Sequence, residues 1–228
     1  TTGGLETVAI RMPSHGVALD LIDEAGLPIA APSANLSGKP SPTRGEHVYH
    51  DLKGRIPFLL DGGEVDIGLE STIIDLSRPD PVILRPGRIT YDDIKPFAPR
   101  LKGNYSISKN DIAHPKAPGM KYKHYAPDGE VYYLSPGEKG VEEISLAKGS
   151  VALLLSAERW AELEGRVSPD FLFILGRKAH LEEIAHNLFH AFRECDRNDI
   201  HTIFIESFSD FGFGEALMNR IKKAAYKE

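Results

Sequence analysis

The sequence has little cysteine and no long apolar run. Cys195 is the single cysteine among 228 residues, so no internal disulfide can form and a reducing, cytoplasmic location is expected. No apolar run approaches the ~18 residues of a membrane-spanning helix, and no signal-peptide pattern opens the chain. Zinc-site spacings, P-loops and the GxSxG and HExxH motifs are missing too, so we predict no metal-binding residue.

Positive charge is also in deficit, because 27 lysines and arginines face 33 acidic residues and leave a net charge of −6. This balance argues against a dedicated nucleic-acid binder, whose domain is usually basic. Hydrophobic residues make up 41% of the chain, which suffices for a packed core in one large or two small domains. No initiator methionine precedes the first expected strand, so we expect the chain to be cut out of a longer protein.

The first half of the chain shows short apolar runs separated by turns. Alternating apolar residues predict a strand over Thr7–Met12, and a helical period predicts a helix that stops at Gly26. Thr43 and Glu46 form the pattern of a capping box at the next helix, and Thr90 is expected to cap a short one. Further strands are expected at 27–31, 58–60, 71–76 and 81–87.

The second half alternates strands and helices, which is typical of a parallel, doubly wound α/β sheet. The strands are expected at 131–135, 151–156, 171–176 and 202–207, and the helices at 137–148, 157–163, 178–195 and 213–226. A proline-bearing linker without an apolar period, residues 97–128, precedes this half. Linkers of that length tend to be functional or disordered. The glycines before the last helix are a weak anion-site signal, and helix packing explains them better.

The most unusual stretch is the serine-rich loop, "APSANLSGKPSPT", which spans residues 31–43 directly after an apolar run. Its hydroxyl and backbone N–H groups suit phosphate oxygens, and the N-terminus of the helix that follows attracts anions. The candidates to line a nucleotide site are Ser33, Asn35, Ser37, Ser41 and Thr43. A proline-rich turn whose hydroxyls only cap the helix remains an open alternative.

Polar residues also stand beside apolar strands. Gly68 permits a sharp entry into Glu70-Ser71-Thr72, and polar groups at a strand end commonly face a cleft. Arg85, between an apolar strand and a Pro-Gly turn, could neutralise a phosphate, and Arg11 could clamp a carboxylate. Taken singly, these residues are explained better as a plain strand start and as surface arginines.

The linker carries a stretch, "HPKAPGMKYKHYAP", with lysines, histidines and tyrosines but no acidic residue. Such a segment could fold over a nucleotide as a lid, using charge and aromatic packing. A solvated basic linker explains the charge, but it does not explain the tyrosines or the "PGM" turn.

Taken in order, "TVAIRMP", "PIAAPSANLSGKPSPT", "GLESTIIDL", "ILRPGRIT" and "PGMKYKHYAP" resemble the Sua5 form of the Sua5/YciO/YrdC family over nearly the whole chain. The resemblance implies an α/β fold in three parts. Residues 1–98 would form part of a concave, twisted-sheet YrdC-like domain, 99–128 a linker across the active site, and 129–228 a Rossmann-like parallel Sua5 domain. Family members carry roughly another half of the first domain before this point, so we expect a C-terminal fragment that is inactive alone.

The resemblance implies a threonylcarbamoyl-AMP synthase, which joins L-threonine, bicarbonate and ATP with release of pyrophosphate. The adenylate then feeds t6A37 modification of tRNA through a downstream transferase, and a divalent cation such as magnesium is expected with ATP. No single catalytic residue is implied. The implied ATP-binding residues are Thr7, Ser33, Asn35, Ser41, Arg85, His124 and Tyr125. The implied threonine-binding residues are Arg11, Ala31 through its backbone, and Ser71.

Two other functions stay open from the sequence. One is an RNA-binding module that uses the concave YrdC-like surface, which the net charge of −6 disfavours. RNA affinity would then fall steeply with salt, since phosphate contacts release counterions. The other is a structural or regulatory fragment in which the Sua5-like part serves as an interaction unit.

Overall fold

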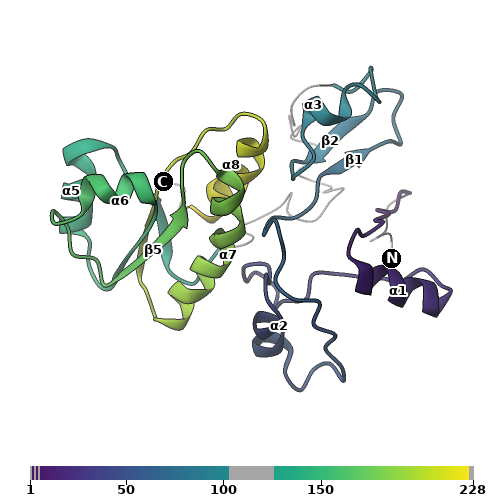
Figure 1. Ribbon diagram of the computed structural model, residues 1–228, viewed down its shortest axis with the longest axis horizontal. Coiled ribbons are helices and arrows are strands. Elements are labelled where there is room, and N and C mark those ends of the chain that lie inside the picture. The colour runs from purple at the N-terminus through teal and green to yellow at the C-terminus, as the bar shows by residue number, and fades with distance from the viewer. Residues whose placement is uncertain (1, 3, 5, 103–125, 226–228) are drawn as a thin grey trace.

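The computed structural model describes residues 2, 4, 6–102 and 126–225. These form two separate sheets, one of two strands and one of four. In Figure 1 the N-terminal segment, residues 6–102, is spread over several pieces beside the C-terminal unit, residues 126–225. Most of the predicted linker lies outside the described residues.

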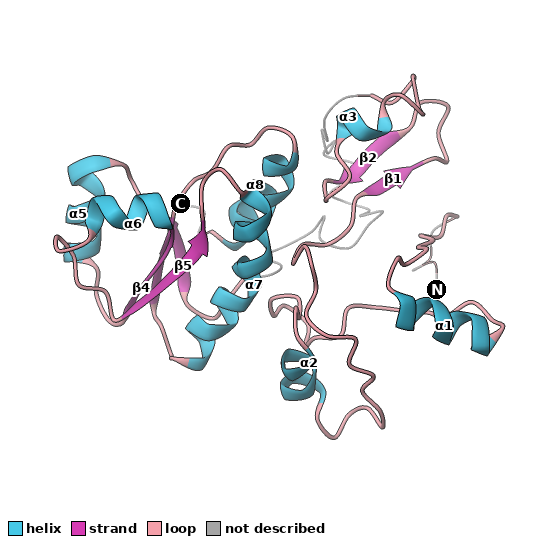
Figure 2. Ribbon diagram, viewed as in Figure 1, coloured by secondary structure: helices cyan, strands magenta, loops and turns pink. Residues whose placement is uncertain are grey.

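The C-terminal unit is a parallel sheet with helices on both faces, as the sequence predicted. Its strands are β3 (Glu130–Tyr133), β4 (Val151–Ser156), β5 (Phe171–Gly176) and β6 (Thr202–Ile205), in the spatial order β3-β6-β4-β5. Its helices are α5 (Gly137–Leu146), α6 (Ala157–Leu163), α7 (Leu181–Arg197) and α8 (Phe213–Ala224). Figure 2 shows α5 and α6 on one side of the sheet and α7 and α8 on the other. Within 6–102 and 126–225, no helix has the length and apolar character needed to cross a membrane.

The core of this unit is built around β4. All of its residues are buried, as expected for a central strand that is covered on both faces. Leu154 packs in one apolar cluster with Phe189 of α7 and Leu217 of α8, whereas Leu153 packs in a second cluster with Leu163 of α6. Successive side chains of a strand point to opposite faces, so this one strand anchors both helical layers.

The N-terminal segment lacks three of the strands that the sequence predicted. Residues 7–12, 27–31 and 58–60 have no strand structure, and the side chains of Ile10 and Phe58 are almost fully exposed. A strand is stable only when its backbone N–H and C=O groups pair with a neighbouring strand. None of the described strands pairs with these runs, so the three strand predictions were wrong. An alternation of apolar residues is not enough to form a strand when no partner strand is present.

The first predicted helix is present as α1 (Gly16–Ala25), and it ends at Gly26, whose φ of 59° is left-handed. Its apolar face is uncovered, because no residue of α1 is buried and Leu21 is 52% exposed. An amphipathic helix gains most of its stability by burying its apolar face. This part of the described chain therefore contributes little to a core.

The antiparallel pair of β1 (Ile73–Asp75) and β2 (Val82–Arg85) confirms the strands predicted there. The short helix α3 (Tyr91–Ile94) follows, and its predicted cap is also confirmed. Thr90 and Asp93 each accept a hydrogen bond from the other's backbone N–H, which completes a capping box. The last three residues of β2 are buried, so the backbone of Arg85, the final residue of this strand, is held firmly in place.

The helix α2 (Gly45–Leu52) is also present, but its predicted capping box is wrong. Its N-cap is Arg44, and no side chain caps the helix. Thr43 lies one residue further out, where its N–H donates to Nδ1 of His47 at 3.1 Å. Because the buried His47 ring holds Thr43 in this way, the chain enters the helix one residue later than expected.

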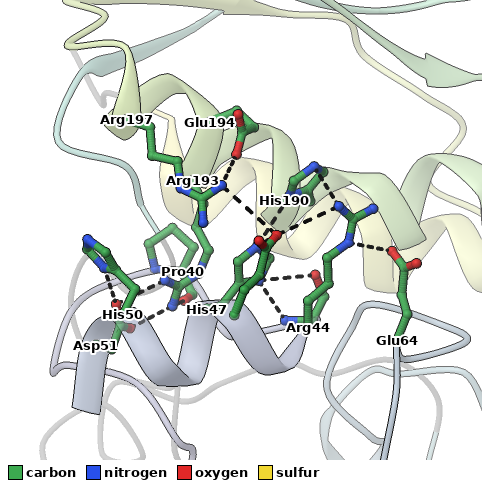
Figure 3. Close-up of polar contacts among 12 residues, drawn as sticks. Pro40, Arg44, His47, His50, Asp51, Glu64, His190, Arg193, Glu194 and Arg197 are labelled. Carbon is green, nitrogen blue, oxygen red and sulfur yellow. Dashed lines mark hydrogen bonds and ion pairs between the residues drawn. The ribbon is translucent and has the colours of Figure 1, made fainter. Parts of the chain in front are cut away.

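Helix α2 packs against α7, and this contact joins the N-terminal segment to the C-terminal unit (Figure 3). The carboxylate of Asp51 accepts hydrogen bonds from both terminal nitrogens of Arg193, at 3.1 and 2.8 Å. About a turn away, the rings of His47 and His190 stack with 5.4 Å between their centroids. Asp51, Arg193 and His47 are all buried, so water has little access to this joint.

Burial and charge at the joint shift two pKa values. Burial lowers the pKa of His47 to about 4, and the neighbouring Arg193 charge adds to the effect. Burial opposes ionisation of Asp51, but the hydrogen bond from Arg193 outweighs it and holds the pKa of that carboxyl at about 2. Near neutral pH the joint therefore combines a neutral histidine with an ionised Asp–Arg pair.

The GLEST loop, residues 68–72, makes the second contact between the two parts. Gly68 has a φ of 74°, and a Cβ at this position would lie 2.6 Å from the carbonyl oxygen of Ala185 on α7. Glycine is thus required twice here, for its left-handed backbone and for the close approach of α7.

Replacing Gly68 with alanine should destabilise the protein more than the same change at Gly26. Both glycines have a positive φ, but a Cβ at Gly26 meets nothing within 4 Å. Gly26→Ala should therefore cost about 1 kcal/mol from backbone strain alone, and Gly68→Ala should cost clearly more. Urea unfolding of both variants measures the difference, and equal losses would show that the GLEST loop does not press on α7.

Acid should weaken the α2–α7 joint. A histidine with an unfolded pKa of about 6.5 and a folded pKa of about 4 takes up its proton more readily when unfolded. Its stabilisation is complete above pH 6.5 and is lost as the pH falls toward 4, by about 2 kcal/mol between pH 7 and pH 5. The free energy of unfolding in urea should show this loss.

The control for that measurement is a pair of variants. His47→Asn keeps an acceptor for the Thr43 N–H but removes the titrating ring, so the acid loss should shrink. Changing Tyr49, an exposed residue of the same helix, to asparagine should leave the wild-type acid loss unchanged. A wild-type acid loss in the His47→Asn variant would contradict the assignment.

Candidate functional site

The GLEST loop is held through Glu70. One carboxylate oxygen of Glu70 accepts a hydrogen bond from the Ser41 hydroxyl at 2.5 Å, and the other accepts one from Nε of Arg220 at 2.7 Å. A second Arg220 nitrogen donates to the backbone carbonyl of Glu70 at 3.3 Å. The structure thus places the serine-rich loop and the GLEST loop side by side, with α8 behind them.

Arg85 meets the same loop from the other side. Its Nε and one terminal nitrogen donate to the carbonyl oxygen of Ser71, at 3.1 and 3.0 Å, and its side chain is buried. The chain next to Arg85 also comes close, because a Cβ at Gly87 would collide with the backbone of residues 70–72. A residue expected to bind ATP and one expected to bind threonine are therefore in direct contact.

The serine-rich loop is held by its own asparagine and by the α2–α7 joint. The Asn35 amide nitrogen donates to the carbonyls of Leu36 and Lys39, at 2.8 and 3.1 Å. Asp51 accepts the Leu36 N–H at 3.3 Å, and Arg193 donates to the carbonyl of Pro40 at 2.6 Å. Both ends of this turn are thus held by hydrogen bonds.

Two buried polar atoms at this turn, Oδ1 of Asn35 and Nε of Arg193, have no hydrogen-bond partner among the described residues. A buried acceptor without a donor costs free energy, and native structures keep few of them.

Positive charge gathers around Glu70. Arg85 comes from the N-terminal segment, whereas Arg220 and Lys223 come from α8. Burial, then the charges of Arg220 and Arg85, lowers the pKa of Lys223 to about 8, and Glu70 opposes them. Basic side chains from both parts of the chain thus gather at the GLEST loop.

The remaining predicted site residues stay predictions. Thr7, Arg11, Ala31 and Ser33 are exposed and lie on irregular backbone. His124 and Tyr125 lie outside the described residues, together with the proposed lid. The structure therefore brings together Ser41, Ser71 and Arg85, through Glu70 and the loop backbone.

The structure also assembles a histidine cluster that the sequence did not reveal. Ligand atoms of Glu46, His47 and His190 lie within 4.8 Å of one another. The two histidines are 143 residues apart, so no local spacing announces them. A cation is disfavoured here, because the Thr43 N–H donates to Nδ1 of His47 and Arg44 lies 3.2 Å from Nε2 of His190.

Nδ1 of His47 and Nε2 of His190 thus each accept a hydrogen bond. A neutral histidine that binds a metal through one ring nitrogen carries its proton on the other, so these two atoms would have to be donors if the cluster held a metal. Three neighbouring arginines add repulsion toward a cation. We therefore assign the cluster to helix packing. Cys195 is similarly structural, since burial raises the pKa of its thiol to about 12 and leaves it unreactive near neutral pH.

Sequence reasoning missed Arg193, Arg220 and Asp51 as parts of the site. A signal existed, because each arginine interrupts the apolar face of an amphipathic helix. Arg193 follows Phe192 and precedes Cys195 on the buried side of α7, and Arg220 sits between buried apolar residues on α8. Arginine is almost never fully buried unless it is paired, so this pattern predicts an acidic partner.

Comparison with known proteins assigns both parts of the chain. Residues 89–226 match the family described as threonylcarbamoyl-AMP synthase, C-terminal domain, and residues 1–87 match the family described as telomere recombination. A threonylcarbamoyl-AMP synthase of Bacillus subtilis is 45% identical over 98% of this chain and 64% of its own length. One from Schizosaccharomyces pombe is 39% identical over 98% of this chain and 58% of its own.

Among solved structures, a crystal structure of Pyrococcus abyssi Sua5 complexed with L-threonine is similar, with a TM-score of 0.86 at 43% identity. That match covers 98% of this chain and 65% of the other. The chain thus spans less than two thirds of the length of each of these relatives. Since the first family match covers more than half of the chain, the chain belongs to the threonylcarbamoyl-AMP synthase C-terminal-domain family, as its resemblance to the Sua5/YciO/YrdC proteins predicted.

Proposed function

We propose that this chain takes part in the synthesis of threonylcarbamoyl-adenylate from L-threonine, bicarbonate and ATP, with release of pyrophosphate. The observation that carries the proposal is the contact of buried Arg85 with Ser71, beside the Glu70–Ser41 hydrogen bond. It joins a position expected to contact ATP to one expected to contact threonine. The similarity to P. abyssi Sua5, whose crystal structure holds L-threonine, supports the same assignment.

The chemistry that this site would serve begins with a carbamate. The amine of L-threonine and bicarbonate combine with loss of water, and a carbamate oxygen attacks the α-phosphorus of ATP. The bond to pyrophosphate breaks, and the adenylate remains. Because a carbamate is short-lived in water, holding it beside the phosphate and excluding solvent would supply much of the catalysis.

The residues around Glu70 suit this reaction electrostatically. Negative charge grows on the phosphoryl oxygens in the transition state, and preorganised guanidinium donors stabilise it without reorganisation. Arg85 and Arg220 donate hydrogen bonds to the GLEST loop from two different elements.

A divalent cation belongs to the proposal as part of the substrate. Magnesium prefers carboxylate and phosphate oxygens and often keeps several waters. Both oxygens of Glu70 are already engaged, by Ser41 and Arg220. We therefore expect magnesium to arrive on the phosphates of ATP, with few protein carboxylates as ligands.

The rest of the proposal concerns the wider setting. Residues 1–98 would belong to the catalytic domain, 99–128 would cover the site with His124 and Tyr125, and 129–228 would form the Sua5 domain. The product would be passed to a transferase that modifies adenosine 37 of tRNA. A cytoplasmic location fits the single, buried thiol.

Pyrophosphate release should require all three substrates. We expect the complete gene product that contains residues 1–228 to release pyrophosphate only when ATP, L-threonine and bicarbonate are present together. Leaving out each substrate in turn tests this requirement. Equal release without threonine would overturn the proposed function.

Residues 1–228 by themselves should make no adenylate, since α1 and residues 58–60 have uncovered apolar faces.

Arg85→Ala should impair nucleotide use more than Arg85→Lys does. A hydrogen bond from a charged group contributes roughly 1.5–3 kcal/mol, so kcat/KM should fall about 10- to 150-fold when the donor is removed. Lysine at this position keeps a charged donor, so kcat/KM should fall less in the Arg85→Lys variant. Arg166→Ala is the matched control, because its partner Glu138 also lies on the C-terminal unit and the pair is exposed. Unchanged kinetics in the alanine variant would place Arg85 outside the site.

A further inference from the structure

Two buried arginines of the C-terminal unit have their hydrogen-bond partners in the N-terminal segment. Arg220 on α8 is 0% exposed and Arg193 on α7 is 7% exposed. Arg220 contacts Glu70, and Arg193 contacts Asp51 and Pro40. Both arginines thus reach across the joint to the loops that carry Ser41 and Ser71, which are predicted to bind ATP and threonine.

Arg220 acts on the GLEST loop at two points. It donates to the Glu70 carboxylate and to the Glu70 carbonyl, so it fixes the side chain and the backbone together. The other carboxylate oxygen of Glu70 then holds the hydroxyl of Ser41. The next peptide carbonyl, that of Ser71, is held by Arg85. Arg220 on α8 therefore fixes Ser41 through the Glu70 carboxylate, and it fixes the backbone next to Ser71 through the Glu70 carbonyl.

Arg193 acts on the serine-rich loop in a similar way. One of its nitrogens donates both to the carbonyl of Pro40 and to Asp51, whose carboxylate in turn accepts the Leu36 N–H. The turn from Leu36 to Pro40 is thus tied at both ends to a single guanidinium. Asn35 and Ser41 directly flank that turn.

Adhesion between the two parts alone would not require these residues. Replacing a buried ion pair with well-packed apolar residues is often neutral or stabilising, because burying the charges is costly. What a guanidinium adds is a planar fork of donors with fixed directions, which sets where a carbonyl or carboxylate lies. Here each fork bonds to a loop carbonyl as well as to an acid.

We propose that Arg220 and Arg193 are positioning residues for the ATP and threonine site, and that the C-terminal unit acts in the reaction by setting the geometry of both loops. This inference rests on the proposed function for the identity of the ligands. It assigns the C-terminal unit a role in substrate binding that requires no contact with substrate. Arg220 serves both substrates, through Ser41 and Ser71, whereas Arg193 serves the nucleotide through the serine-rich loop.

The first test measures loop order without any substrate. Hydrogen–deuterium exchange of the complete gene product should show faster exchange at residues 68–72 in Arg220→Met and at residues 36–41 in Arg193→Met. Arg159→Met is the matched control, because Arg159 is also buried and, among the described residues, its side chain bonds to Ser135 and Glu162 of its own unit. It should leave both loops as in the wild type.

The second test measures KM for each substrate by pyrophosphate release, below the unfolding temperature of every variant. Arg220→Met should raise KM for both ATP and L-threonine about tenfold or more, and Arg220→Lys should recover part of the loss. Arg193→Met should raise KM for ATP more than KM for L-threonine. A purely structural role would lower stability without this division between substrates.

Glu70→Gln keeps the assay decisive if Arg220→Met does not fold. The amide preserves the shape of the side chain but weakens its bond to Arg220, so both KM values should rise by a smaller factor. Unchanged loop exchange and unchanged KM values in folded variants would overturn the inference. If the wild type uses neither ATP nor threonine, the proposed function fails, and the exchange measurement alone decides whether the arginines hold the loops.

Discussion

The ion pair of the buried Arg220 with the partly buried Glu70 is the interaction on which the candidate site depends. Removing one partner of such a pair leaves an uncompensated charge and costs about 3–5 kcal/mol, so the two must stay together. Because Glu70 also holds Ser41, the pair ties α8 to two loops at once. The Asp51–Arg193 pair repeats this arrangement at α7. The parallel sheet behind these helices gives both arginines a rigid base.

The sequence predicted the C-terminal unit well, but in the N-terminal segment it predicted three strands that the structure does not form, for a physical reason. Runs such as the one at 151–156 form strands because neighbouring strands and helices of the same unit cover them. The run at 7–12 has the same local pattern but no partner among the described strands, and it stays irregular. Alternation reports that a segment is able to pair, whereas the partner decides whether it does.

The candidate site was predictable only in part. Ser41, Ser71 and Arg85 were identified from the residues and the family resemblance, and they meet around Glu70. Arg193 and Arg220 were not, because their partners lie more than a hundred residues away in the chain. The same distance hid the stacking of the histidines at the α2–α7 joint. Local pattern shows which residues carry chemistry, but only the packing of the two parts shows which residues hold them in place.

Lys223 gives the site a further property. With a pKa of about 8, this side chain is partly neutral in mildly alkaline solution. Any anion that settles beside Arg85 favours its charged form and raises that pKa, so binding draws a proton from solvent. Binding and proton uptake are then thermodynamically linked, and the heat of binding depends on the ionisation enthalpy of the buffer. If an anion binds beside Arg85 as proposed, its binding should therefore be accompanied by proton uptake at Lys223.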